Sequence, residues 1–146
     1  MIMSHTIALS IGIPIAGIFV SLGLLHIYWA LGRSSASAAV IPFHNGRPLF
    51  TPTLATTLLV ALALLVCALL VLGSLGILRF GLPNWLLRIG VWGVAAAFLL
   101  RAIGDFRYLG LFKTVRNTSF ARNDSWFYSP LCVVIAINCV LLGVLR

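Results

Sequence analysis

The charged residues near the end of the third apolar run have types and a spacing that could do chemistry. Arg101 and Asp105 are four residues apart, so on a helix they share a face and can form an ion pair. An ionisable residue in an apolar run costs at least about 2.5 kcal/mol, which makes the pair a candidate functional site. The alternative is a self-neutralising pair that anchors the helix end at the membrane interface. Residues at intervals of three and four give this face a stripe of Gly90, Gly93, Ala97, Arg101, Asp105 and Tyr108.

Polar residues at compatible depth in the first and fourth runs extend this candidate site. We expect small residues on the stripe to let neighbouring helices approach closely, which would turn the charges toward the bundle interior. The sequence therefore predicts a polar ligand pocket formed by the first, third and fourth helices. Its candidate residues are His26, Tyr28, Trp29, Arg101, Asp105, Arg107, Tyr108, Asp124, Tyr128 and Ser129. The aromatic residues near both runs also fit an interfacial belt, and these are Tyr28, Trp29, Trp126 and Tyr128.

Metal, haem and redox chemistry find little support in the sequence. His26 is the one histidine inside a predicted helix near the candidate site, and no second histidine or carboxylate cluster completes a ligand set. Cys67, Cys132 and Cys139 form no CxxC pair and are expected to be small packing residues. We predict neither a metal site nor a cofactor, and no catalytic residue can be named.

The elements that position these residues follow from the composition. The chain has 146 residues, of which 62% are hydrophobic and 8% charged, with a mean hydropathy of +1.14. A soluble chain of this size could not cover so much apolar surface. Four apolar segments at 6–32, 53–78, 85–106 and 126–145 each reach the roughly 20 residues that a helix needs to cross a bilayer. The sequence predicts one all-α domain over 1–146, an integral membrane four-helix bundle.

The distribution of basic residues predicts how the chain inserts. Ten Lys and Arg residues against two acids give a net charge of +8, but they lie between apolar runs, so bilayer topology explains them better than nucleic acid does. The face with connections 33–52 and 107–125 carries Arg33, Arg47, Arg107, Lys113, Arg116 and Arg122, against Arg79, Arg88 and Arg146 on the other. The positive-inside rule predicts cytoplasmic connections and periplasmic termini in a bacterial inner membrane.

The third connection has the composition of a segment that lies on an anionic surface. Lys113, Arg116 and Arg122 alternate there with aromatic residues, and anionic lipid head groups are the expected partner. A bound phosphate or carboxylate ligand is the more specific alternative, because basic residues outnumber the two local acids, Asp105 and Asp124.

Three motifs together resemble an uncharacterised family of small four-helix bacterial membrane proteins. They are LHIYWALG in the first run, GRPLFTP in the first connection, and LLRAIGDFRYLGLFKTVRNTSFARNDSWFYSPLC from Leu99 to Cys132. The resemblance implies a membrane location and a four-helix architecture but no activity. It covers His26, Tyr28, Trp29, Gly46, Pro48, Phe50, Pro52, Arg101, Gly104, Asp105, Arg107, Tyr108, Lys113, Arg116, Asp124, Tyr128, Ser129 and Pro130. Many members carry Glu after the loop proline, where this chain has Phe43 and His44. That departure weakens a mechanism that needs a third carboxylate.

Three functions are compatible with the sequence. The first is binding or transport of a small anionic or amphiphilic ligand, with Arg101 and Arg107 as anion contacts; transport by so narrow a bundle would need a homo-oligomer. The second is an intramembrane enzyme acting on a lipid-like substrate with Asp105 or His26 as acid or base, although no nucleophile–base pair, metal set or phosphate loop supports it. The third is an accessory or immunity protein whose basic connection docks a membrane protein partner.

Overall fold

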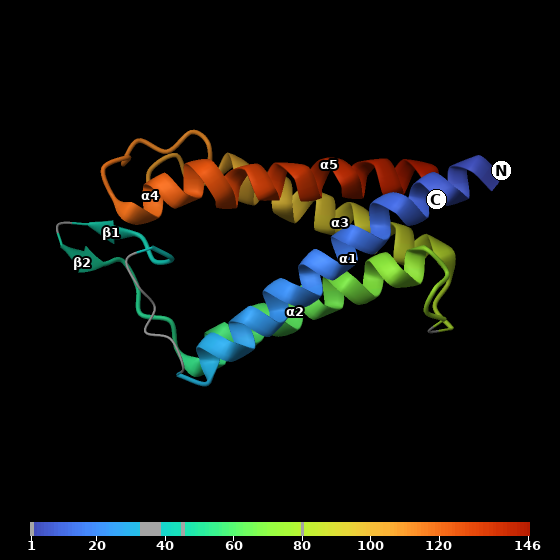
Figure 1. The fold of residues 1–146 in the computed structure, drawn as a ribbon, viewed down its shortest axis with the longest axis horizontal. Coiled ribbons are helices and arrows are strands. Elements are labelled where there is room, and N and C mark those ends of the chain that lie inside the picture. The colour runs from blue at the N-terminus through green and yellow to red at the C-terminus, as the bar shows by residue number, and fades with distance from the viewer. Residues whose placement is uncertain (1, 33–38, 45, 80) are drawn as a thin grey trace.

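Four long helices form the protein, as the computed structural model shows (Figure 1). The structure describes residues 2–32, 39–44, 46–79 and 81–146, so the expectation for Arg33 lies outside the described residues. The long helices are α1 (Ile2–Ala30), α2 (Leu54–Ser74), α3 (Asn84–Ile103) and a last helix built from α4 (Ser119–Asn123), η1 (Asp124–Tyr128) and α5 (Ser129–Leu145). All four are long and apolar enough to cross a membrane. The prediction of an all-α, four-helix membrane protein is confirmed.

The helices pack as two antiparallel pairs. α1 packs mainly against α2, and α3 packs mainly against α5, with smaller contacts of α2 with α3 and of α1 with α5. In Figure 1 the pairs lie together at the end where N and C are marked, and they separate toward the end with both long connections. Phe19, Val71, Val91, Ile135 and Cys139 are buried where the pairs meet. The bundle therefore has a closed end at the termini and an open end at the connections.

Local sequence explains where the helices begin and end. Thr53 caps α2 by accepting the Thr56 amide, while the Thr56 hydroxyl accepts the Thr53 amide. The predicted end at 78 is four residues too late, because Gly76 takes a positive φ of 76° just after Ser74. The predicted start of the fourth helix at 126 is seven residues too late. Thr118 caps that helix by accepting the Ala121 amide, and polar residues hide its first turns in the sequence.

Two irregular features lie at the open end. Strands β1 (Phe43–His44) and β2 (Arg47–Pro48) form a short antiparallel hairpin in the first connection, which the sequence did not predict. η1 is a π-helical turn within the last helix, in which the Ser129 amide donates to the Asp124 carbonyl five residues earlier. The hairpin and the π-turn both lie beside the residues of the candidate site.

Candidate functional site

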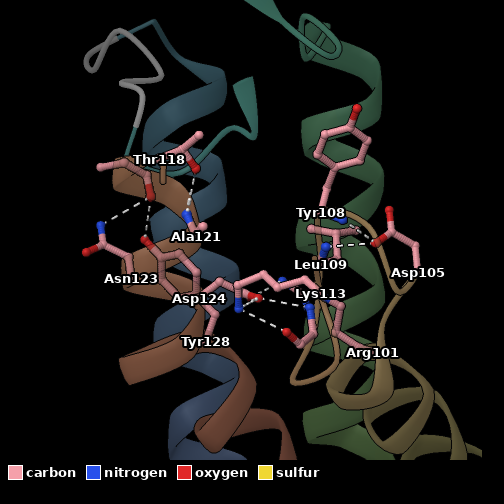
Figure 2. A network of polar contacts seen from close by, with 12 residues as sticks. Arg101, Asp105, Tyr108, Leu109, Lys113, Thr118, Ala121, Asn123, Asp124 and Tyr128 are labelled. Atoms are coloured by element: carbon pink, nitrogen blue, oxygen red, sulfur yellow. Dashed lines mark hydrogen bonds and ion pairs between the residues drawn. The ribbon is translucent and has the colours of Figure 1, made fainter. Parts of the chain in front are cut away.

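Asp124 is the centre of a buried ion-pair cluster that joins α3, η1 and the third connection. Its Oδ1 accepts Arg101 Nη2 at 2.9 Å, and its Oδ2 accepts Lys113 Nζ at 3.0 Å and the Gly110 amide at 2.9 Å. Asp124 is fully buried and Lys113 is 2% exposed. Figure 2 shows Arg101 and Lys113 converging on the carboxylate from two different segments. A buried carboxylate with this many donors is stabilised in its charged form.

The expected pair of Arg101 with Asp105 is wrong. α3 ends at Ile103, and Gly104 takes a positive φ of 82°, so Asp105 and Tyr108 no longer follow the helical stripe. Asp105 is exposed and turns back on its own segment, where Oδ1 accepts the amides of Arg107, Tyr108 and Leu109 at 2.9, 2.7 and 2.8 Å. The true partner of Arg101 lies 23 residues away, a separation that helical periodicity cannot predict.

The Asp105 carboxylate is held ionised by this local turn. Its slight burial works to raise the pKa, but the backbone donors from Leu109, Tyr108 and Arg107 outweigh it and hold the pKa of Asp105 below its ordinary value. Both acidic side chains of the protein are therefore engaged with the backbone of the third connection.

The third connection folds back onto the end of α3. The Leu111 amide donates to the Ala102 carbonyl at 2.8 Å, and Gly110 packs against Gly104 so closely that a Cβ on either residue would collide with backbone. The Lys113 Nζ also donates to the Gly110 carbonyl at 2.9 Å. Lys113 is thus a structural residue inside the protein, and its predicted place on a lipid or anion surface is wrong. Burial next to Asp124 leaves it no access to lipid.

The other predicted surface cations are exposed. Arg107, Arg116 and Arg122 lie on the surface of the third connection and α4. Phe106 and Phe112 of the third connection and Trp126 and Phe127 of η1 are exposed as well. The Arg107 guanidinium lies 5.2 Å from the centroid of the Tyr108 ring. This part of the surface therefore combines basic groups with large aromatic side chains.

The first connection contacts the last helix through η1 and its neighbours. Tyr128 donates from its hydroxyl to the Ala39 carbonyl at 3.2 Å, and Asn123 donates from Nδ2 to the same carbonyl at 3.3 Å. His44 meets the Tyr108 ring edge-on at 5.8 Å. These contacts hold Tyr108 and Tyr128 beside the first connection, at the same end of the molecule as the Asp124 cluster.

A cavity at this end lies between α1, α2 and the first connection. It has a volume of about 500 Å³ and is lined by His26, Trp29, Ala30, Gly32, Val40, Ile41, Phe50, Pro52, Thr53, Leu54, Thr56, Thr57 and Val60. Only His26 and Trp29 of the predicted pocket residues line it, and none of its lining residues comes from α3, η1 or α5. This cavity is therefore a different one from the predicted pocket of the first, third and fourth helices, which remains a prediction.

His26 presents a defined chemical group to this cavity. Its Nδ1 lies 2.8 Å from the Leu22 carbonyl oxygen, which can only accept, so Nδ1 carries a proton. In the neutral ring Nε2 is then an acceptor. Trp29 packs against the imidazole edge at 5.1 Å between centroids. One polar acceptor thus lies in a lining that is otherwise rich in aliphatic and aromatic side chains, with threonine hydroxyls at the start of α2.

Sequence reasoning missed the residues that α2 and the first connection contribute to the cavity. Thr53 and Thr56 carry a recognisable signal, because two hydroxyl residues three apart before an apolar run are typical of a helix start. That helix start places Thr57 and Val60 one turn further along, on the cavity side. Nothing comparable in the sequence predicts that Val40 and Ile41 return to α1.

A family model described as "Protein of unknown function (DUF3995)" matches residues 19–139. The chain belongs to this family. The match spans the three motifs from Leu25 to Cys132, and the expected membership of an uncharacterised family is confirmed. The DUF3995 description carries no activity. No curated protein and no solved structure matches the chain.

Proposed function

We propose that the protein binds a small amphiphilic molecule in the cavity between α1, α2 and the first connection. The observation that carries this proposal is the lining of the 500 Å³ cavity, in which apolar and aromatic side chains surround the His26 ring. Ligand sites are typically apolar cavities of this size with a few placed polar groups. Among the residues that the structure describes, the lining holds the His26 ring and threonine hydroxyls and no arginine or lysine, which favours an uncharged polar head such as a hydroxyl.

The structure supports binding better than acid–base catalysis. Asp105 accepts three backbone amides, and Asp124 is surrounded by Arg101, Lys113 and the Gly110 amide. Neither carboxylate lines the cavity with His26. A histidine without a partnering acid in the cavity can accept a ligand hydroxyl, which is a binding role.

The test uses 11-bromoundecanol as the probe, because its bromine quenches tryptophan fluorescence and its hydroxyl can donate to His26. We expect saturable quenching of Trp29 in detergent-solubilised protein in which the exposed Trp85, Trp92 and Trp126 are replaced by phenylalanine. Ala30→Phe should fill part of the cavity and weaken binding by about tenfold, since a displaced ligand loses apolar contact. Ala96→Phe is the matched control, because Ala96 is exposed on α3 and lines no part of this cavity. Equal quenching in both variants, or loss in both, would contradict the proposal.

We also propose that the open end faces the cytoplasm of a bacterial inner membrane. The exposed basic and aromatic residues of the third connection support this orientation and contact with anionic head groups. Replacing the three native cysteines by serine and introducing Arg116→Cys gives a label site at this end. A membrane-impermeant maleimide should react with it only after the inner membrane is opened, and labelling of intact spheroplasts would reverse the orientation.

A further inference from the structure

A second, smaller cavity lies at the closed end of the bundle, on the opposite membrane face from the His26 cavity. It has a volume of about 180 Å³ and is lined by Ser74, Asn84, Leu87, Arg88, Val91, Leu142, Gly143 and Arg146. In Figure 1 the end of α2, the start of α3 and the end of α5 come together here, beside the marked termini. In the sequence its arginines contribute only to the charge balance, so the cavity is a feature that only the fold reveals.

Two guanidinium groups from different helices line this cavity. Arg146 is oriented by a hydrogen bond from its Nε to the Ser74 carbonyl at 2.7 Å, which leaves its terminal nitrogens for other acceptors. Arg88, one helical turn into α3, forms no ion pair or hydrogen bond with any residue that the structure describes. Buried Val91 and Leu142 form the inner side of the cavity. The cavity therefore has a cationic rim over an apolar floor.

The charge at this end is not balanced by any acidic side chain. The two acids of the chain, Asp105 and Asp124, both lie at the opposite end, where they bind the third connection. Arg79 adds a third cation nearby in the sequence, but it does not line the cavity. An anion in the cavity would meet two guanidinium donors and no acidic side chain.

We propose that this cavity binds a phosphate group. The planar fork of a guanidinium matches the oxygens of a phosphate, and charge-assisted bonds of this kind are among the stronger ones in proteins. Asn84 and Ser74 add polar groups at the rim. The phosphate is carried by a lipid head group or is free in solution, and the apolar floor suits the first of these.

The experiment compares three probes on the full chain in an uncharged detergent, with thermal unfolding and native mass spectrometry as readouts. The probes are dioctanoylphosphatidylglycerol, dioctanoylglycerol, which lacks the phosphate, and inorganic phosphate. We expect the phospholipid to bind and raise the unfolding temperature, while dioctanoylglycerol does neither. Stabilisation by inorganic phosphate as well would show that free phosphate suffices, and stabilisation by the phospholipid alone would assign a head group.

The variants separate this cavity from the basic surface at the other end. Arg88→Gln should weaken phosphate binding by about tenfold, and Arg88→Gln with Arg146→Gln by more, because each loses a charged hydrogen-bonding group. Arg88→Gln alone breaks no hydrogen bond or ion pair among the described residues, so it keeps the test valid if the double variant does not fold. Arg79→Gln removes the same charge from the same face and should bind normally. Absence of binding to the wild type, equal loss in Arg79→Gln, or unchanged binding in Arg88→Gln would overturn the proposal.

Discussion

Arg101 and Asp124 form an ion pair at 2.9 Å across 23 residues of chain, and this contact joins the end of α3 to the π-turn of the last helix. Lys113 reaches the other oxygen of the same carboxylate from the intervening connection. The three residues carry one net positive charge. Arg101 Nη1 is buried without a hydrogen-bond partner among the residues described, so the cluster retains an unused donor.

Asp124→Asn is expected to destabilise the protein by about 3–5 kcal/mol, because it leaves Lys113 buried without its counter-charge. Thermal unfolding in detergent measures the effect. Adding Lys113→Met to Asp124→Asn should recover part of the loss, since the unpaired buried charge is then gone. A double variant as unstable as the sum of the two single variants would show that the ion pair is not the source of the effect.

The Asp105 turn should depend on pH in a defined direction. The pKa of Asp105 is lower in the folded protein than its ordinary value of 3.8, so its contribution to stability is fully present above that value. The contribution is lost as the pH falls through the lower folded-state pKa. NMR titration of the Arg107, Tyr108 and Leu109 amides should therefore show a midpoint below 3.8. Asp105→Asn should abolish the titration, and its persistence in that variant would assign it to another group.

Gly104→Ala should disrupt the return of the third connection to α3. Gly104 has a positive φ, and a Cβ there would collide with the Leu109 carbonyl. We expect a loss of at least about 1–3 kcal/mol from the backbone conformation alone. Gly93→Ala is the matched control, because a Cβ at Gly93 meets no atom within 4 Å. Comparable unfolding temperatures for the two variants would contradict the packing of Gly104 against the connection.

The Ala39 carbonyl links the proposed ligand cavity to the last helix. Tyr128 and Asn123 both donate to it, and Val40 and Ile41, which follow it directly, line the cavity. Tyr128→Phe with Asn123→Ala should therefore weaken 11-bromoundecanol binding severalfold while costing about 1–3 kcal/mol of stability for the two hydrogen bonds. Asn117→Ala, on an exposed side chain of the third connection that does not line this cavity, is the comparison. Unchanged binding in the double variant would show that other contacts hold Val40 and Ile41 in the lining of the cavity.

The sequence predicts the four spans well because length and apolar composition determine them, and both are local properties. It places Arg101 correctly near a helix end. It assigns the wrong partner because the i,i+4 rule assumes that the helix continues, whereas Gly104 ends it before Asp105. The partner Asp124 precedes the predicted fourth span and is reached only through tertiary folding.

The burial of Lys113 is beyond sequence reasoning for a similar reason. A lysine in a polar, basic connection is ordinarily exposed, and only the return of Gly110 and Leu111 to the end of α3 encloses it. The two cavities were missed because each is formed by segments that meet only in the folded chain. The threonines at the start of α2 were the one local signal available for either cavity.

The π-turn at Asp124–Tyr128 makes the direction of the Asp124 side chain depend on the number of residues in the last helix. A π-turn holds one residue more than an α-turn, and each residue of an α-helix rotates the chain by about 100°. Deleting one residue between Asp124 and Ser129 would let the segment relax into plain α-helix and swing the carboxylate about 100° away from Arg101 and Lys113, while α5 kept its packing against α3. The segment from Asp124 to Ser129 is therefore intolerant of a change in length. Substitutions of its exposed Trp126 and Phe127 leave that length unchanged.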